Sequence, residues 1–313
     1  MIPIENYLDL DVAYLLGLVT ARGSLQESPD RRIVIQFPFS SLNVQGVTTK
    51  YDQDTQLRLG TSAIRDRLVE LLETDVQVIA KRNLITILIK FFRNSIPWRN
   101  LNLHLQGRMN YGEFEIPQQI IDAPADIQKE FVRGIADVSG YIRQSNNYFD
   151  RKRRVYIEIP NANWRLPVQL CRLLQVNLSV PVQLIQWGHP NTREPFKLRK
   201  GTSWAREHQL KIFAESFEPI GFYIDHKQKI LQEFIQDDRT RFPGDTHFCD
   251  PNPSLHNYRK KPKHPEERSK RLPKEVSKHF DCYWQICTAM GCTQKGLWSG
   301  ATQLPIFNDD EQV

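Results

Sequence analysis

Apolar positions recur with helical spacing in two segments of this chain that match each other. Each segment is an apolar run with one glycine inside it and a second glycine six residues later. The two pairs are Gly17 with Gly23 and Gly134 with Gly140. Glycine inside a helix costs about 1 kcal/mol relative to alanine, so Gly17 and Gly134 predict two helix backbones in close approach. The second glycine of each pair is expected to end its helix in a left-handed conformation.

The same order of patterns follows each of these helices. First comes a run in which apolar and polar residues alternate, as in a half-buried antiparallel strand. An amphipathic helical segment and a further apolar strand come next. The expected elements are strand 31–37, helix 63–72 and strand 84–91 in the first half, and strand 153–159, helix 166–174 and strand 209–213 in the second. Two unrelated amphipathic helices remain the alternative for the glycine pattern alone, but the repeated order favours two copies of one module.

The repeat resembles the LAGLIDADG homing endonucleases in their single-chain form with two motifs. The segment 131–140 fits the family's motif with its Phe-x-x-Gly opening, and Ile220-Gly221-Phe222 with Lys227 and Leu231 is similar to the way such domains close. The resemblance covers roughly residues 10 to 235. It implies an α+β fold in which two pseudo-symmetric αββαββα halves form a saddle-shaped antiparallel sheet. It also implies a monomer that binds double-stranded DNA.

This organisation predicts four parts of the chain. They are an N-terminal half at 1–112, a linker at 113–126, a C-terminal half at 127–236 and a basic, proline-rich extension at 237–313 with a short C-terminal helical segment.

The chain departs from the family at the residue before the last glycine of each motif. The resemblance places there a pair of carboxylates that bind a divalent metal, but this chain has Arg22 and Ser139. Arginine has no acceptor atom, and serine brings no negative charge to hold Mg²⁺. Because two-metal cleavage of a phosphodiester needs such charge, we expect the inherited chemistry to be lost, with no metal or other cofactor.

Other candidates for catalysis remain in the two motifs and the last strands. Asp137 is a single carboxylate, either a hydrogen-bonding residue near the helix end or a repurposed ligand for Mg²⁺ in an active endonuclease. Lys90 and Lys211 lie in the last strand of each half. The resemblance implies a supporting basic residue there, whereas a lysine at a strand end is more often only solvated.

The composition favours a polyanionic partner. The 313 residues carry a net charge of +6. Opposite the apolar stripe of each expected strand lie polar residues, among them arginine and glutamine, which can read guanine and adenine edges. The resemblance implies that this face is the concave side that faces DNA. The residue pattern alone indicates only the solvent-exposed side of an antiparallel sheet. The candidate contacts in the two halves are Arg32, Gln36, Tyr156 and the basic run Arg151, Lys152, Arg153 and Arg154, on an expected hairpin tip at 146–154. That tip is otherwise an ordinary solvated turn.

The last part of the chain is basic and rich in proline. Between residues 241 and 280 ten Lys and Arg face five acidic residues, which supplies +5 of the net charge. This stretch, including Arg259, Lys260 and Lys261, is either an arm that lies along a duplex or a solvated tail. The spacing of Cys282, Cys287 and Cys292 does not fit a zinc knuckle, and the odd number of cysteines argues against a disulfide framework.

The sequence shows no signal peptide and no apolar run that could span a membrane, so we expect a reducing, intracellular (cytoplasmic) setting and no membrane partner. The favoured function is binding of double-stranded DNA at a selected, quasi-palindromic site without cleavage. Alternatives are an active endonuclease of the homing or restriction type, a maturase that binds structured intron RNA, and an interaction protein without nucleic acid.

Overall fold

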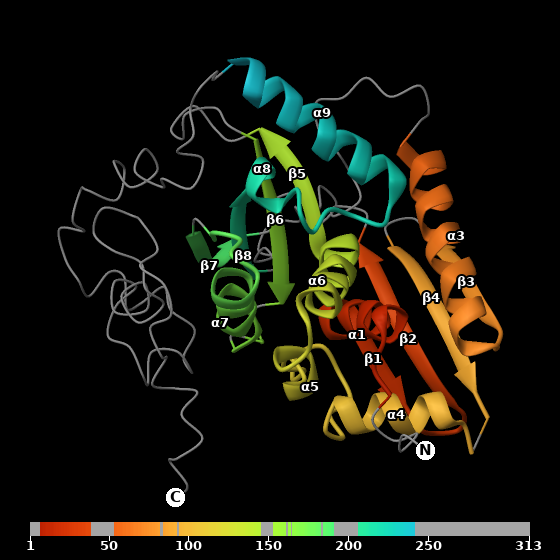
Figure 1. Cartoon of the computed structure of the whole chain (residues 1–313). Coiled ribbons are helices and arrows are strands. Elements are labelled where there is room, and N and C mark those ends of the chain that lie inside the picture. The colour runs from red at the N-terminus through yellow and green to blue at the C-terminus, as the bar shows by residue number, and fades with distance from the viewer. Residues whose placement is uncertain are drawn as a thin grey trace, which may run out of the picture.

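The fold subdivides into two halves that repeat one order of helices and strands (Figure 1). The computed structural model describes residues 7–38, 53–81, 84–92, 94–144, 153–160, 162–163, 165–182, 184–190 and 206–241. The first half contains α1 (Leu10–Arg22), β1 (Gly23–Gln26), β2 (Arg31–Pro38), α3 (Gln53–Leu72), β3 (Val76–Lys81), β4 (Leu84–Phe91) and α4 (Ile96–His104). After α5 (Gln118–Ile121), the second half contains α6 (Ala125–Ser139), β5 (Gly140–Gln144), β6 (Arg153–Pro160), α7 (Arg165–Arg172), η2 (Leu173–Asn177), β7 (Leu184–Pro190), β8 (Arg206–Phe213), α8 (Ala214–Phe217) and α9 (Asp225–Arg241).

The strands form two four-stranded antiparallel sheets with equivalent orders, β1-β2-β4-β3 and β5-β6-β8-β7. In the first sheet Ile33 lies opposite Ile89, and in the second Ile157 lies opposite Leu210; all four side chains are buried. This confirms the α+β class and the alternation that the sequence predicts for these strands. The two ladders are separate sheets within the described residues, where the expectation was one saddle-shaped sheet.

The helices α1 and α6 hold the two halves together. They pack against each other, and both contact β2, while α6 also contacts β5 and β6 (Figure 1). A Cβ at Gly17 would lie 2.1 Å from the carbonyl oxygen of Phe131, and a Cβ at Gly134 would lie 2.3 Å from that of Tyr14. The contacts are reciprocal and leave no room for a side chain. The close approach of backbones predicted from these two glycines is therefore confirmed.

Gly23 and Gly140 correct one expectation. Their φ angles are −91° and −93°, so each is extended and enters a strand directly, not through a left-handed turn. They are needed for space. A Cβ at Gly23 would lie 2.6 Å from the carbonyl oxygen of Val19, and one at Gly140 would lie 2.5 Å from that of Ala136.

Helix α1 is buried from Val12 to Ala21, as expected for a helix that is apolar on nearly all sides. The segment after α4 adds to the edge of the first sheet, because Leu25 N donates to Met109 O and Tyr111 N donates to Gly23 O. Helix α3 begins ten residues before the predicted start at 63. None of the helices in the described ranges has the length and apolar character needed to cross a bilayer. The predicted domain boundaries stay predictions.

Candidate nucleic-acid interface and helix junction

The ends of α1 and α6 carry a cation and a hydroxyl. Arg22 is the last residue of α1, and its Nη2 lies 2.7 Å from Oε1 of Glu207 in β8. Both side chains are largely buried, 13% and 10% exposed. The C-terminal end of a helix has a partial negative charge, which a guanidinium stabilises. Ser139, the last residue of α6, is fully buried and brings no charge. The junction therefore holds an arginine–glutamate ion pair and an uncharged hydroxyl where a metal pair would need two free carboxylates.

Asp137 is a hydrogen-bond hub of the fold. Its Oδ2 accepts from the hydroxyl of Tyr14 at 2.7 Å and from the backbone N–H of Tyr223 at 3.1 Å, and its Oδ1 accepts from Ile224 N at 3.3 Å. The carboxylate is fully buried, which raises its pKa, and nearby Lys227 opposes that rise. Of the two roles that the sequence leaves open for Asp137, these contacts match the hydrogen-bonding one.

Lys227 is a buried lysine of α9 that lies at the C-terminal end of α6. Its Nζ donates to the carbonyl oxygens of Asp137 at 2.7 Å, Gly140 at 2.6 Å and Ala136 at 3.3 Å. Asp137 lies in the last turn of α6, where a helix leaves carbonyls without an intrahelical partner. Ala136 O also accepts from the backbone N–H of Gly140, and Gly140 is the first residue of β5. Burial lowers the pKa of Lys227 to about 7, against the attraction of Asp137. Lys227 lies on the apolar face of α9, three and four residues before Ile230 and Leu231. This helical spacing was the signal in the sequence that the lysine would be buried.

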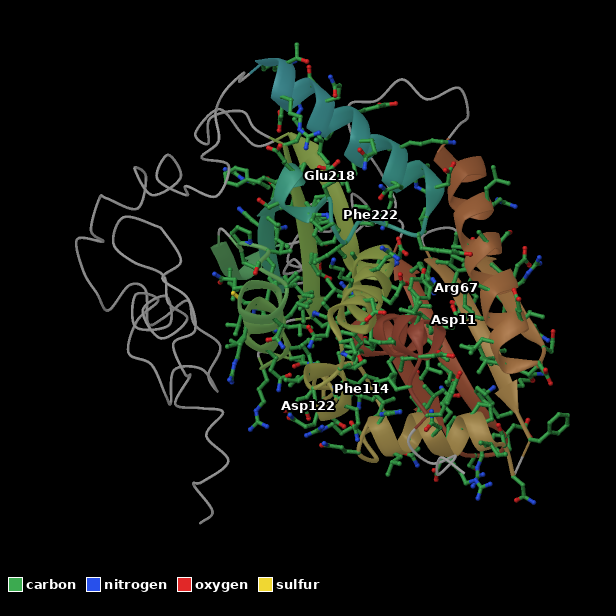
Figure 2. The ribbon with its side chains drawn as sticks, viewed as in Figure 1. Asp11, Arg67, Phe114, Asp122, Glu218 and Phe222 are labelled. Atoms are coloured by element: carbon green, nitrogen blue, oxygen red, sulfur yellow. The ribbon has the colours of Figure 1, made fainter. Side chains whose placement is uncertain are left out.

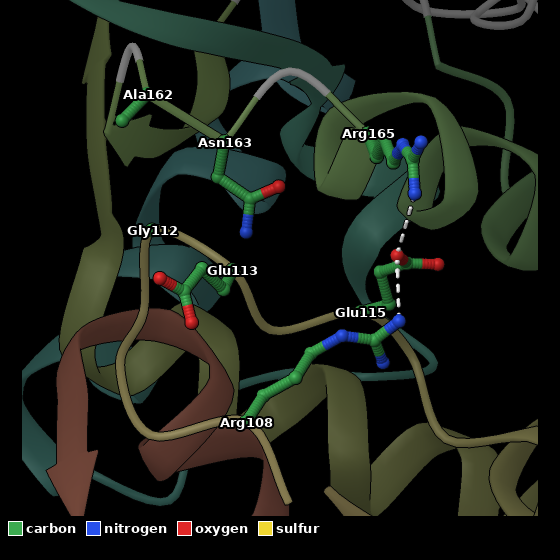
Figure 3. A pocket seen from close by; sticks show the side chains of 7 residues that line it. All are labelled: Arg108, Gly112, Glu113, Glu115, Ala162, Asn163 and Arg165. Atoms are coloured by element: carbon green, nitrogen blue, oxygen red, sulfur yellow. Dashed lines mark hydrogen bonds and ion pairs between the residues drawn. The ribbon is translucent and has the colours of Figure 1, made fainter. Parts of the chain in front are cut away.

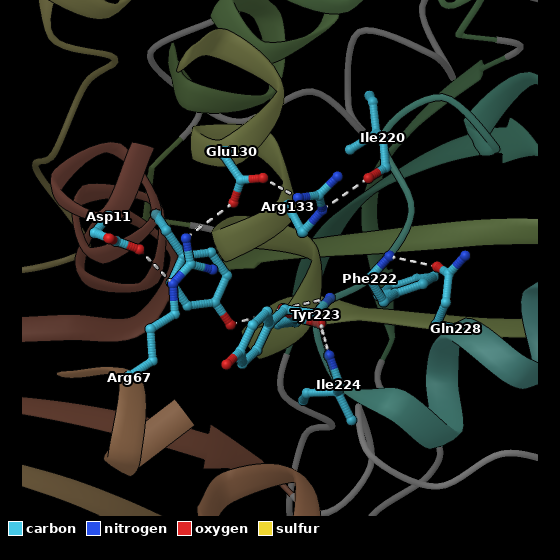
Figure 4. Close-up of polar contacts among 11 residues, drawn as sticks. Asp11, Arg67, Glu130, Arg133, Ile220, Phe222, Tyr223, Ile224 and Gln228 are labelled. Carbon is cyan, nitrogen blue, oxygen red and sulfur yellow. Dashed lines mark hydrogen bonds and ion pairs between the residues drawn. The ribbon is translucent and has the colours of Figure 1, made fainter. Parts of the chain in front are cut away.

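Arg67 of α3 joins elements from both halves. Its guanidinium lies 4.1 Å from the ring centroid of Tyr14 and 4.7 Å from that of Tyr223. It also pairs with Asp11 at 2.7 Å and with Glu130 at 3.3 Å (Figures 2 and 4). Cation–π contacts of a desolvated guanidinium are worth about 2 kcal/mol or more. Sequence reasoning missed this cluster, because its members come from four distant segments.

The polar face of the first sheet is accessible. Arg32 lies opposite Lys90 and Gln36 lies opposite Thr86 in the β2–β4 ladder, so these four side chains share one face. Gln36 and Lys90 are exposed, and Arg32 is partly exposed and donates a hydrogen bond to Gln26. The face predicted for nucleic acid in the first half is thus open to solvent.

The corresponding face of the second sheet is buried. Arg154, Tyr156 and Lys211 are 1%, 2% and 7% exposed, which corrects the prediction of a wet strand face in this half. Burial, together with the charges of Arg154 and Arg143, lowers the pKa of Lys211 to about 7.

The two residues of the predicted basic hairpin tip that the structure describes lie in the strand predicted over 153–159, and they are buried instead of exposed to solvent. Arg153 and Arg154 belong to β6, and Arg153 pairs with Asp237 and Asp238 of α9. The two arginines are buried because the chain is already inside the sheet at this point. The other predicted contacts lie outside the described residues: Arg151, Lys152, Arg259, Lys260 and Lys261. Cys282, Cys287 and Cys292 lie outside them as well.

A small polar cavity of about 300 Å³ lies at the segment that joins the two halves (Figure 3). Glu115 bridges two arginines that line it, Arg108 at 2.9 Å and Arg165 at 3.1 Å. Glu115 also accepts from Gln169. Glu115 therefore links the two arginines, and with Glu113, which also lines the cavity, the charges of the two arginines are balanced. The cavity is part of the joint between the halves.

Comparisons with known proteins give matches among solved structures only. No family model matches the chain, and no curated protein matches it. A structure of mesophilic variants of the homing endonuclease I-DmoI is 15% identical, with 67% of this chain and 92% of that chain covered and a TM-score of 0.37. I-DmoI in complex with DNA and Mn is 13% identical, with 70% and 96% covered and a TM-score of 0.35. Full-length DUF199/WhiA from Thermatoga maritima is 14% identical, with 90% and 76% covered and a TM-score of 0.40.

Proposed function

We propose that this protein is a monomer that binds double-stranded DNA at a selected sequence. The observation that carries the proposal is the open polar face of the first sheet, with Arg32, Gln36 and Lys90 on adjacent strands. Arginine and glutamine form paired hydrogen bonds with guanine and adenine in the major groove, and a β-ribbon fits that groove. The lysine suits a phosphate, and the net charge of +6 favours a polyanion.

The proposal includes binding without cleavage at the junction of α1 and α6. Metal-assisted hydrolysis of a phosphodiester needs anionic ligands that hold the ions against the attacking and leaving oxygens. Arg22 brings no ligand for a divalent ion there. Its ion pair with Glu207 neutralises the carboxylate that lies beside it.

The second candidate is an endonuclease of the homing or restriction type that binds Mg²⁺ through Asp137. A metal at Asp137 would have to displace the hydroxyl of Tyr14 and two backbone N–H groups from a fully buried carboxylate. The test is incubation of the protein with a plasmid library of random inserts and Mg²⁺ or Mn²⁺. We expect the DNA to stay uncut. Discrete fragments that need the added metal, and that are lost in an Asp137→Asn variant whose circular dichroism matches that of the wild type, would establish the enzyme.

Removal of one positive charge from the polar face of the first sheet is expected to weaken the binding of all duplexes about equally. Lys90→Ala removes one phosphate contact, so the slope of log K against log salt should fall by about 1. Lys229→Ala is the matched control, because it removes the same charge from an exposed site on α9. Fluorescence anisotropy on labelled duplexes at several salt concentrations measures both variants. Equal effects of the two variants would show that the phosphate contact is not made by Lys90. Tighter binding of structured RNA than of duplex DNA would favour the maturase alternative.

A further inference from the structure

The polar face of the first sheet also carries side chains that end in methyl groups. The registers of the ladders place every second residue of β4 and β3 on the same face as Arg32 and Gln36. The core of this sheet lies on its other face, where Ile35 and Ile87 are fully buried, so packing of the core does not explain these side chains. Ile79 is 40% exposed, and the rest are partly exposed. The methyl-bearing residues of this face are Val34 in β2, Leu84, Thr86 and Leu88 in β4, and Ile79 in β3.

The charged residues that the ladders place on this face are all cations. Arg32 lies opposite Lys90 at one end of the face, and Lys81 is exposed at the other end. Asp75, one residue before β3, accepts a hydrogen bond from Gln77 at 2.6 Å. Accessible apolar groups with a polar rim mark surfaces that bind a partner. A partner for this face must therefore match methyl groups that lie between positive charges.

Duplex DNA offers this combination in its major groove. Thymine presents a C5-methyl group there, which apolar side chains contact, and the phosphates on either side bind cations. Side chains on one face of an antiparallel strand are about 6.8 Å apart, which equals two base-pair steps of about 3.4 Å. Val34 lies midway between Arg32 and Gln36 on β2, with Leu88 directly opposite it. A strand that follows the groove therefore brings Val34 and Leu88 to a base pair between those that the arginine and the glutamine contact.

We infer that Val34 and Leu88 read the C5-methyl group of thymine, so that the recognised DNA carries a T·A pair between the guanine that Arg32 binds and the adenine that Gln36 binds. The inference rests on the proposed function and names its substrate class more closely, as a duplex distinguished by a methyl group. Burial of one methyl group against an apolar side chain corresponds to about fourfold in affinity.

Replacement of thymine by deoxyuridine, which lacks only the C5-methyl group, tests this inference with the full chain. Selection of bound fragments from a random duplex pool first identifies the preferred site, and we expect thymine at a fixed position between a preferred guanine and a preferred adenine. Deoxyuridine at that position should lower the affinity of the wild-type protein about fourfold.

Variants of the two side chains locate the contact. Leu88→Ala and Val34→Ala should each bind the thymine and deoxyuridine duplexes more nearly equally than the wild type does, and either variant serves if the other does not fold. Val69→Ala is the matched control, because it shortens an apolar side chain that is 41% exposed on α3. It should keep the wild-type difference between the two duplexes.

The outcomes separate this inference from the proposed function. Three results would overturn the methyl contact and leave DNA binding in place: equal wild-type affinity for the two duplexes, a selected site without thymine between guanine and adenine, or a wild-type difference that persists in both Leu88→Ala and Val34→Ala. Failure of the wild-type protein to enrich any sequence would overturn both.

Discussion

Replacing Gly17 with alanine is expected to lower the free energy of unfolding by more than about 3 kcal/mol, beyond the usual range for overpacking. The new Cβ would lie 2.1 Å from the carbonyl oxygen of Phe131 and 3.1 Å from Cα of Gly134. Both are backbone atoms, so no side chain can rotate away. The helices α1 and α6 must separate instead, which loosens the core that both sheets share. Urea unfolding followed by far-UV circular dichroism measures the loss.

Gly107→Ala is the matched control for this prediction. Gly107 has φ +70°, and a Cβ there would meet nothing within 4 Å beyond its chain neighbours. Alanine at this position therefore costs only the strain of a left-handed backbone conformation, about 1–2 kcal/mol. Gly134→Ala should behave like Gly17→Ala, because its Cβ would lie 2.3 Å from the carbonyl oxygen of Tyr14. If Gly17→Ala and Gly107→Ala cost the same, the two halves do not depend on this helix contact.

Lys227→Met is expected to lower the free energy of unfolding by more than about 3 kcal/mol, because buried acceptors that lose their donor cost about 1–3 kcal/mol each. The carbonyls of Asp137 and Gly140 lie 2.7 and 2.6 Å from Nζ and would lose this donor. Lys229→Met on the same helix is the control. Its side chain is 70% exposed, and its change should stay within about 0.5 kcal/mol.

The same variant tests the pH dependence of stability. Burial lowers the pKa of Lys227 from 10.5 to about 7, and the nearby charge of Asp137 opposes that shift. The unfolded chain therefore binds more protons than the folded chain between these two values, and stability from this group rises with pH across that window. The difference in stability between wild type and Lys227→Met should widen from about pH 7 to about pH 10. A difference that narrows would show that the ammonium form, with three N–H donors, is the one that caps α6.

The sequence predicted the features that local patterns control. The strand over 84–91 has the predicted bounds, and Gly17 and Gly134 meet as their helical context indicated. The strand could be predicted because burial of one face makes apolar residues recur with a fixed period along the chain. The helix contact could be predicted because a glycine inside a helix is destabilising unless close packing requires it. The predicted conformation of Gly23 was wrong, because a strand begins at that residue without a turn.

The rest depends on partners that are distant in the sequence. Arg22 pairs with Glu207, and Asp137 accepts a hydrogen bond from Tyr14. These partners are more than 100 residues apart in the sequence, and no periodic pattern of residues indicates such pairs. The alternation Arg154, Tyr156, Glu158 is the same whether this face of β6 is exposed or buried. The sequence therefore predicted a wet face for β6, and in the structure these side chains are buried.

Competition binding tests the central claim most directly. The wild-type protein is titrated, at physiological salt, against the selected duplex, a shuffled duplex of the same composition, and heparin. Specific DNA-binding proteins prefer their site over other duplexes by at least about 10³ in affinity, and we expect that margin here. Equal affinity for the selected duplex, the shuffled duplex and heparin would contradict the account and leave only a basic surface.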